Sequence, residues 1–210
     1  GGPGRCVPLA QELATPEDGR TLVRRAVETF GRIDILVANH GIWESKDEPI
    51  ATMPESQWRR TLAINLDSVY GLVQAAASQM QQQKPEGPSP AAKAHIVLVS
   101  STAGQRGEAF HADYAASKGA IISMTKGLAT ELAPAGIQVN CVAPGWVATD
   151  MSAAALGDAK TRAWIFGAIP LGRVADPREI AGPILFLCTP LAGFMTGEIV
   201  NVNGGAVLVG

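Results

Sequence analysis

Two apolar runs decide the fold: His95-Ile96-Val97-Leu98-Val99-Ser100 and, further along the chain, Ile137-Gln138-Val139-Asn140-Cys141-Val142. Runs of this length, rich in β-branched residues, predict strands buried in a sheet. The stretch between them, Asp113 to Ala133, predicts a helix that ends before Gly136. Two strands joined by a helical crossover are typically parallel, so these residues predict one βαβ unit.

The same alternation of strands and helices continues on both sides of this unit. It predicts a single α/β domain over residues 1–210 with a parallel sheet covered on both faces. Pro144 to about Ile169 shows no clear pattern and is interpreted as a mobile flap, and Gln81 to Ala92 as a surface loop. The remaining predicted elements are a helix from Thr15 to Phe30, a strand from Ile33 to Ala38 buried on both faces, one long helix through Trp58, Leu66 and Ala76, a helix from Asp176 to about Cys188, and a last strand from Glu198 to Val202.

Composition excludes several classes of protein. The chain has 210 residues, 47% hydrophobic and 17% charged, which fits one ordered domain and not a disordered chain. The net charge of −2 gives no basic surface for nucleic acid or an anionic membrane. The three cysteines are widely spaced and the three histidines lack metal-ligand spacing, so we expect no metal. No signal peptide or membrane span is visible, and we expect a soluble, cytoplasmic protein.

Tyr114 and Lys118 stand four residues apart in Tyr114-Ala115-Ala116-Ser117-Lys118, which puts them on one face of the predicted helix. A free tyrosine has a pKa near 10, and a nearby ammonium group is expected to lower it. Tyr114 could then give a proton to a carbonyl oxygen, or take one from an alcohol. The alternative is a helix that carries a solvated tyrosine and lysine, and the pair alone favours that alternative.

Polar residues at strand ends strengthen the catalytic interpretation. Ser101 could donate to a developing oxyanion, or only cap a turn. Asn65, inside an apolar stretch, could order a water near Lys118, or only satisfy a local backbone carbonyl. Asn39 and Pro144-Gly145 also follow strands, so they should gather with Ser101 at the carboxyl edge of the sheet. Ser-His-Asp hydrolysis lacks support because no G-x-S-x-G elbow is present.

Taken in order, these residues resemble the classical short-chain dehydrogenase/reductase family, in particular its 3-oxoacyl-[acyl-carrier-protein] reductase branch. Ala38-Asn39-His40-Gly41 is similar to the family's Asn-Asn-Ala-Gly element, and Ser101, Tyr114 and Lys118 match its catalytic serine, tyrosine and lysine. The segment Pro144 to Met151 resembles its Pro-Gly element that faces the nicotinamide, and Ile169 to Arg173 and Val202 to Gly205 resemble its closing segments. The resemblance implies a Rossmann-like doubly wound parallel sheet and NAD or NADP as cofactor.

The resemblance also implies roles for individual residues. Tyr114 would be the general acid/base, Lys118 would bind the nicotinamide ribose, Ser101 would hold the substrate oxygen, and Asn65 would support a water-mediated proton relay. Residues 150–168 would form the substrate lid. The implied cofactor contacts, besides Tyr114 and Lys118, are Glu12 and Leu13 near the adenine, Asn39 at the adenosine-side ribose, Gly41 at a close approach, and Pro144, Gly145, Val147 and Thr149 at the nicotinamide.

The first two strands of the family fold and its Gly-rich phosphate loop have no counterpart in the chain. We therefore expect an N-terminally incomplete domain in which the strand from Ile33 has an unpaired edge. We also expect these 210 residues to bind a dinucleotide weakly. Ala135 stands where carrier-protein reductases often have a basic residue, which weakens the case for an acidic carrier protein.

The expected function is NAD(P)-dependent interconversion of a ketone and a secondary alcohol, with a 3-oxoacyl thioester as one possible substrate. The small-molecule site would lie in a homodimer or homotetramer that pairs through the helices carrying Asn65 and Tyr114. One alternative is a catalytically silent scaffold that dimerises but binds no cofactor. Another is a hydrolase that uses Ser101.

Overall fold

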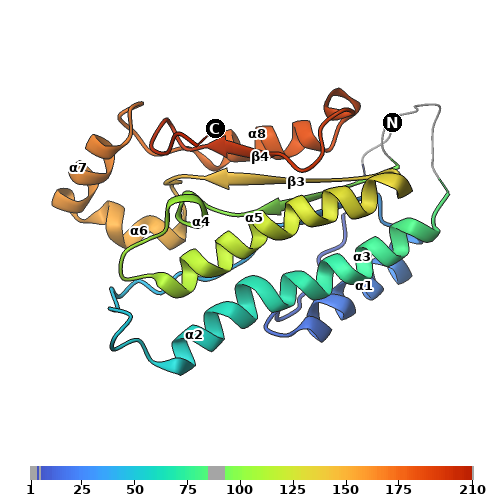
Figure 1. The fold of residues 1–210 in the computed structure, drawn as a ribbon, viewed down its shortest axis with the longest axis horizontal. Helices are drawn as coiled ribbons and strands as arrows, with labels where there is room; N and C mark the ends of the chain where they lie inside the picture. Colours follow the sequence, from blue (N-terminus) through green and yellow to red (C-terminus); the bar gives the residue numbers. More distant parts are fainter. Residues whose placement is uncertain (1–3, 5, 85–92, 210) are drawn as a thin grey trace.

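The computed structural model describes residues 4, 6–84 and 93–209, and within them it forms a four-stranded parallel sheet (Figure 1). The strands β1 (Ile35–Ala38), β2 (Ala94–Val99), β3 (Ile137–Pro144) and β4 (Ile199–Val202) are adjacent in that order. Their carboxyl ends are in register, with Ala38 opposite Leu98 and Pro144 opposite Val202. The predicted parallel α/β fold is therefore confirmed, and the strand ends gather at one edge.

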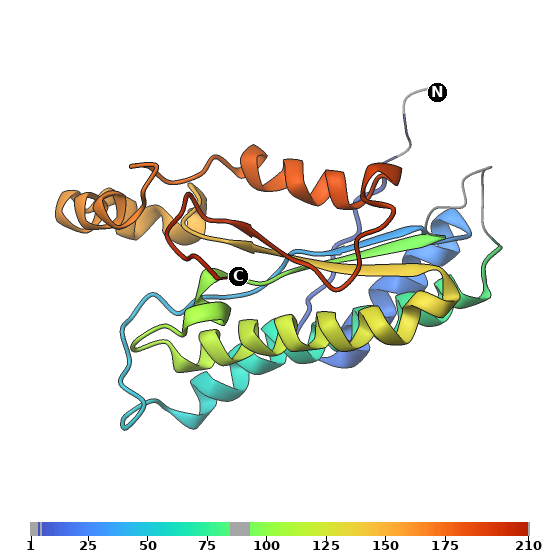
Figure 2. The same ribbon diagram turned by 45° about the horizontal axis from the view of Figure 1, so that its top comes forward.

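Helices lie on both faces of the sheet (Figures 1 and 2). One face packs against α1 (Pro16–Phe30), α3 (Ser68–Gln82) and α5 (Ala112–Leu132), and the other against α8 (Pro177–Leu187). The first core includes Val23, Leu72, Ile96 and Ile121, and the second includes Val97, Val142 and Leu187. The alternate residues of β2 therefore serve different cores, which explains its uninterrupted apolar sequence.

Two glycines bring α1 and α3 unusually close. A Cβ atom on Gly71 would lie 1.9 Å from the Pro16 carbonyl oxygen, and one on Gly19 would lie 2.4 Å from the Ser68 carbonyl oxygen. No larger residue fits at either position without moving a helix backbone. This contact fixes the position of α3 relative to α1. Helix α3 continues from the segment that carries Asn65.

The first strand is less buried than predicted. We expected Ile33 to Ala38 to be buried on both faces, but β1 begins at Ile35, and Ile35 and Val37 are 47% and 40% exposed. Leu36 and Ala38 pack on the core with α1 and α3, whereas none of the described helices covers the face of Ile35 and Val37. As predicted, the outer edge of β1 is unpaired: among the described strands it pairs only with β2.

The long predicted helix is interrupted. It consists of α2 (Glu55–Leu62), a π-helical turn η1 (Ala63–Asp67) and α3. The Ser68 N–H donates to the Ala63 carbonyl, five residues back, which inserts one extra residue into the turn. Asn65, at the middle of the turn, is fully buried.

The predicted flap is two helices, α6 (Asp150–Gly157) and α7 (Ala159–Ala168), so the absence of a pattern was misleading. Thr149 and Asp158 begin the helices as N-caps, and the Asp158 carboxylate accepts from the Thr161 N–H at 2.7 Å. The alanines of these two helices favour helix formation, but they do not produce the apolar stripe that would have predicted a helix.

The shorter elements are α4 (Thr102–Arg106), η2 (Ala133–Ala135) and η3 (Pro190–Ala192). In the predicted Gln81–Ala92 loop, residues 81 and 82 end α3, and residues 85–92 lie outside the described residues. No described helix combines the length and apolarity that a membrane span requires.

Candidate active site

Helix α5 places Tyr114 and Lys118 one turn apart beside the carboxyl end of β2. The Ser100 hydroxyl donates to the Lys118 carbonyl at 2.7 Å, which ties α5 to that strand end. Gly104 lets α4 approach, since a Cβ atom there would lie 2.6 Å from the Lys118 carbonyl carbon. The catalytic candidates are therefore held by backbone contacts and not only by side-chain packing.

Ser101 caps a helix, as one of its two predicted roles requires, and its donation to an oxyanion stays a prediction. Its Oγ accepts from the Ala103 N–H at 3.1 Å and so caps α4. A side-chain hydrogen bond also joins it to Tyr114 and favours the phenolate, lowering the pKa of that tyrosine. The same hydroxyl therefore contacts both the start of α4 and Tyr114.

The pKa of Tyr114 is nevertheless raised above its ordinary value of 10.0. Burial is the main cause, the Ser101 hydrogen bond opposes it, and the Glu108 carboxylate adds a smaller increase. The expectation that Lys118 would lower this pKa is wrong for the protein alone. The Lys118 ammonium lies 5.8 Å from the centre of the tyrosine ring and binds elsewhere.

Lys118 is almost fully buried, with 5% of its surface exposed, and burial lowers its pKa to about 8. Its ammonium donates to the Val99 carbonyl at 3.0 Å, at the end of β2. An ammonium group has three N–H donors. Within the described chain only this one hydrogen bond is seen, so the remaining donors are available to a ligand hydroxyl.

Asn65 binds the loop that follows β1. Its Oδ1 accepts from the Ile42 N–H at 2.7 Å, and its Nδ2 donates to the Ile42 carbonyl at 3.0 Å and to the Ser117 hydroxyl at 3.2 Å. The amide thus satisfies backbone groups of a distant loop, not a local carbonyl. Its part in a proton relay stays a prediction.

Gly41 lies between Asn65 and Lys118. A Cβ atom on this residue would lie 3.0 Å from Asn65 Oδ1 and 3.4 Å from Lys118 Nζ. The missing side chain thus lets the loop backbone lie directly against these two polar groups. Asn39, at the end of β1, is exposed at the same edge.

The end of β3 supplies the other side of the site. The Gly145 N–H donates to the Val202 carbonyl at 3.0 Å, and a Cβ atom on Gly145 would lie 3.0 Å from Asn203 Cα. Val147 forms a parallel bridge with Ala175, and Thr149 begins α6. These contacts fix the segment that leads from the sheet edge to α6. It carries Pro144, Gly145, Val147 and Thr149.

Glu12 and Leu13 lie apart from this cluster. Glu12 is exposed, and Leu13 packs against the core beside α1. Among the described residues, no hydrogen bond or ion pair joins either side chain to the residues around Tyr114. Their assignment to the adenine stays a prediction.

Two aromatic neighbours of Tyr114 were not singled out from the sequence. Trp43 stacks on His111, with ring centres 3.8 Å apart, and meets Tyr114 edge-on at 4.8 Å. His111 Nε2 lies 3.1 Å from Asp47 Oδ1, which fastens the loop after β1 to the start of α5. The spacing of His111, three residues before Tyr114, was a usable signal, but Trp43 is too distant in sequence to be found this way.

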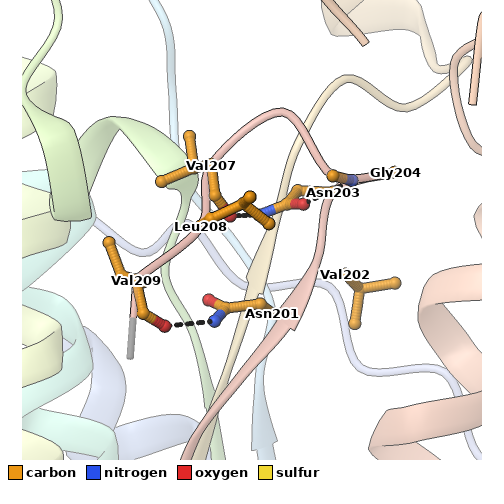
Figure 3. Close-up of a pocket in the computed structure, with 8 residues that line it drawn as sticks. Asn201, Val202, Asn203, Gly204, Val207, Leu208 and Val209 are labelled. Atoms are coloured by element: carbon orange, nitrogen blue, oxygen red, sulfur yellow. Dashed lines mark hydrogen bonds between the residues drawn. The ribbon is translucent and has the colours of Figure 1, made fainter. Parts of the chain in front are cut away.

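A separate hollow lies away from these residues. A cavity of about 620 Å³ is lined by the segment from Asn201 to Val209 (Figure 3). Asn203 Nδ2 donates there to the Val207 carbonyl at 2.8 Å, and Asn201 Nδ2 to the Val209 carbonyl at 3.4 Å. The lining includes no titratable side chain. No group of three or more metal-ligating side chains is assembled in the described residues.

Comparisons with known proteins agree with this geometry. A family model described as enoyl-(acyl carrier protein) reductase matches residues 3–207. The 3-oxoacyl-[acyl-carrier-protein] reductase of Vibrio cholerae is 36% identical over 201 residues, 96% of this chain and 78% of the relative. The L-rhamnose 1-dehydrogenase (NAD(P)(+)) of Azotobacter vinelandii is 35% identical over 202 residues, 96% of this chain and 75% of the relative.

Solved structures show the same fold. A short-chain dehydrogenase/reductase from Brucella melitensis superposes with a TM-score of 0.82 and 38% identity, covering 94% of this chain and 74% of that one. A gluconate 5-dehydrogenase from Burkholderia cenocepacia, in complex with NADP and tartrate, gives a TM-score of 0.83 and 30% identity, with 92% and 72% covered.

The fold and the site define an NAD(P)-dependent oxidoreductase that acts on CH–OH and C=O groups. The chain belongs to the short-chain dehydrogenase/reductase family.

Proposed function

We propose that Tyr114 is the general acid/base with which this protein interconverts a ketone and a secondary alcohol. One observation carries the proposal: the partly exposed Tyr114 is hydrogen-bonded to Ser101 and lies one helical turn before a buried lysine. In reduction the phenol gives its proton to the carbonyl oxygen, and in oxidation the phenolate takes the alcohol proton. Ser101 donates to the same substrate oxygen as charge develops on it.

Lys118 and Asn65 support the acid/base. The unused Lys118 N–H groups bind ribose hydroxyls of NAD or NADP, which brings the ammonium charge to the reacting centre when the cofactor is bound. The nicotinamide ring, when present, supplies or accepts the hydride. Asn65 keeps the loop at Ile42 in place, and it supports the proton relay to solvent. Tyr114, Ser101, Lys118 and Asn65 are then the four catalytic residues.

The remaining cofactor contacts follow the edge of the sheet. Gly41 and Gly145 lie on the loops that follow β1 and β3, where the absence of a side chain leaves the backbone accessible to a nucleotide. Asn39 binds the adenosine-side ribose, the segment of Pro144, Gly145, Val147 and Thr149 faces the nicotinamide, and Glu12 with Leu13 contributes near the adenine.

We further propose that α6 and α7 form the substrate lid over residues 150–168. Met151 and Trp164 are 51% and 66% exposed, and they present apolar surface to a ligand. This surface favours an acyl chain, and relatives named as 3-oxoacyl-[acyl-carrier-protein] reductases support a 3-oxoacyl thioester as the first substrate to assay. The protein assembles as a homodimer or homotetramer through the helices that carry Asn65 and Tyr114.

The test compares the two tyrosines of the chain. NADH and NADPH oxidation is measured with a short 3-oxoacyl thioester, and the reverse reaction with secondary alcohols. We expect Tyr114→Phe to lower kcat by about 100-fold or more, with nucleotide fluorescence titrations unchanged. Tyr70→Phe, which alters the exposed tyrosine of α3, is the control and keeps parental turnover.

Equal turnover by Tyr114→Phe and the parent would overturn the assignment. A parent protein that binds neither nucleotide would instead favour the silent scaffold. Ester cleavage without nucleotide, lost in Ser101→Ala, would favour the hydrolase.

A further inference from the structure

His40 occupies the third position of Ala38-Asn39-His40-Gly41, where the similar family element has alanine. Its side chain reaches from the end of β1 to the π turn. His40 Nε2 lies 3.1 Å from the Ile64 carbonyl oxygen and 2.6 Å from the Ser68 hydroxyl. Nothing in the proposed reaction so far uses this imidazole.

The contacts of Nε2 determine which ring nitrogen carries the hydrogen. A carbonyl oxygen only accepts, and the Ser68 hydroxyl already donates to the same Ile64 carbonyl at 2.7 Å. The arrangement that satisfies all three contacts has the Nε2–H donating to both oxygens while the Ser68 hydroxyl donates to Ile64. In the neutral ring Nδ1 is then the nitrogen that is free to take a proton.

These contacts act on the turn that presents Asn65. Because the Ser68 N–H donates to Ala63, the Ile64 carbonyl is met by side-chain donors, from His40 and Ser68. The Asn65 side chain is in turn held by the backbone of Ile42. Residues 40 and 42 thus fix positions 64 and 65, and Gly41 between them borders Lys118 Nζ.

His40 is also coupled to the lysine electrostatically. Burial lowers the pKa of His40 below 6.5, and the Lys118 cation lowers it further. Three other ionisable groups lie on the packed elements nearby. Asp67 of η1 is exposed, Tyr114 of α5 has a raised pKa and stays neutral, and the buried Asp113 of α5 accepts hydrogen bonds from Thr61 and Gln57 of α2. Protonation of His40 would therefore add a second positive charge to a pocket that already holds one.

We propose that His40 is a positioning residue of this enzyme: its neutral imidazole holds the π turn in the shape that presents Asn65, and its protonation disturbs the Lys118 ammonium. The inference rests on the proposed function, in which Asn65 and Lys118 support Tyr114. It predicts that activity falls on the acid side as His40 gains its second proton, because two cations repel in a desolvated pocket.

The first measurement does not need turnover. Nitrogen-15 NMR of the labelled histidines, of which there are three, reports the tautomer and titration of each, and His40→Gln assigns the signal. We expect the Nε2–H tautomer and a titration midpoint below 6.5 that moves upward in Lys118→Met. An Nδ1–H tautomer, or a midpoint that ignores Lys118→Met, overturns the proposal.

The second measurement is the pH profile of kcat for the parent, His40→Ala and His40→Gln. The glutamine amide can reach the position of Nε2 and donate, but it does not titrate. We expect His40→Ala to lose about tenfold in kcat, the effect of one hydrogen bond to a buried carbonyl, and His40→Gln to recover most of it. In both variants we expect the fall of kcat at acid pH to disappear, because neither side chain titrates.

His95→Gln is the matched control, because His95 is also partly buried with a lowered pKa but lies near the start of β2, away from the site. It should keep the parental profile. A parental profile in both His40 variants, alongside an inactive Tyr114→Phe, overturns the role of His40 and leaves the proposed function standing. Parental turnover in Tyr114→Phe overturns the proposed function itself, and the NMR titration then decides on His40 alone.

Discussion

At the scale of single residues, burial acts on Tyr114 and Lys118 in opposite directions. Desolvation disfavours whichever form is charged, so it raises the pKa of the phenol and lowers that of the ammonium. The free protein therefore holds a neutral tyrosine at neutral pH. This is the form that carbonyl reduction consumes, and the bound ligands must supply the stabilisation that oxidation requires.

Replacing Lys118 by methionine should stabilise the protein in a pH-dependent way. The pKa is about 8 in the folded protein against 10.5 ordinarily, so the unfolded chain binds more protons between those values. Stability therefore rises with pH through that window, by about 3 kcal/mol in total. We expect Lys118→Met to raise the free energy of unfolding near neutrality and this advantage to shrink at alkaline pH.

Urea denaturation at neutral and alkaline pH measures this difference. Lys126→Met is the control, since Lys126 is exposed on the same helix and should show little change. If Lys118→Met raises the free energy of unfolding by the same amount at both pH values, the buried charge of Lys118 is not the cause.

At the scale of elements, the contact of α1 with α3 depends on glycine. The Gly71→Ala methyl would overlap the Pro16 carbonyl, and backbone cannot yield as a flexible side chain can. We expect a loss of about 3 kcal/mol or more in the free energy of unfolding. Gly127→Ala, within α5 and with nothing near its added Cβ, should instead stabilise by about 0.5–1 kcal/mol.

Thermal denaturation of both variants tests the contact. Because both changes place alanine inside a helix, their intrinsic helix preferences cancel, and the difference between them reports packing. Equal stability of the two variants would mean that α3 can move away from α1 at little cost.

The sequence was informative where one local rule dominated. Helical spacing places Tyr114 and Lys118 on one face of α5, and apolar runs predict the strands. The capping box at Asp176 and Glu179 predicts the start of α8, which the structure confirms. The π turn could not be predicted, because one inserted residue hardly alters a pattern of apolar residues. The contacts of Asn65 with Ile42 and of Trp43 with Tyr114 join segments that are distant in sequence, and no periodicity reports them.

At the scale of the molecule, the margin of the sheet at β1 carries exposed apolar residues. The outer margin of β1 is unpaired within the described residues, and a cavity of about 470 Å³ lies beside it between α1 and the strand. Unpaired edges with exposed apolar residues pair readily with other strands. We therefore expect this chain to associate through β1 as its concentration rises.

Val37→Lys should reduce that association, because a charged side chain disfavours the approach of a second strand. Light scattering over a range of concentrations gives the measurement. Val209→Lys is the control, as Val209 has a similar exposed fraction, 44%, but lies outside the sheet. Equal scattering by the two variants would place the association elsewhere.

The central strands also determine how long the site survives partial opening of the molecule. β2 and β3 are buried along most of their length, and Ser101, Gly145 and the partner of Lys118 all lie at their ends. Amide hydrogens of such strands exchange with solvent only when the whole domain opens. We therefore expect α6 and α7 to fray and re-form many times while Ser101, Gly145 and Lys118 keep their arrangement, which is lost only on global unfolding.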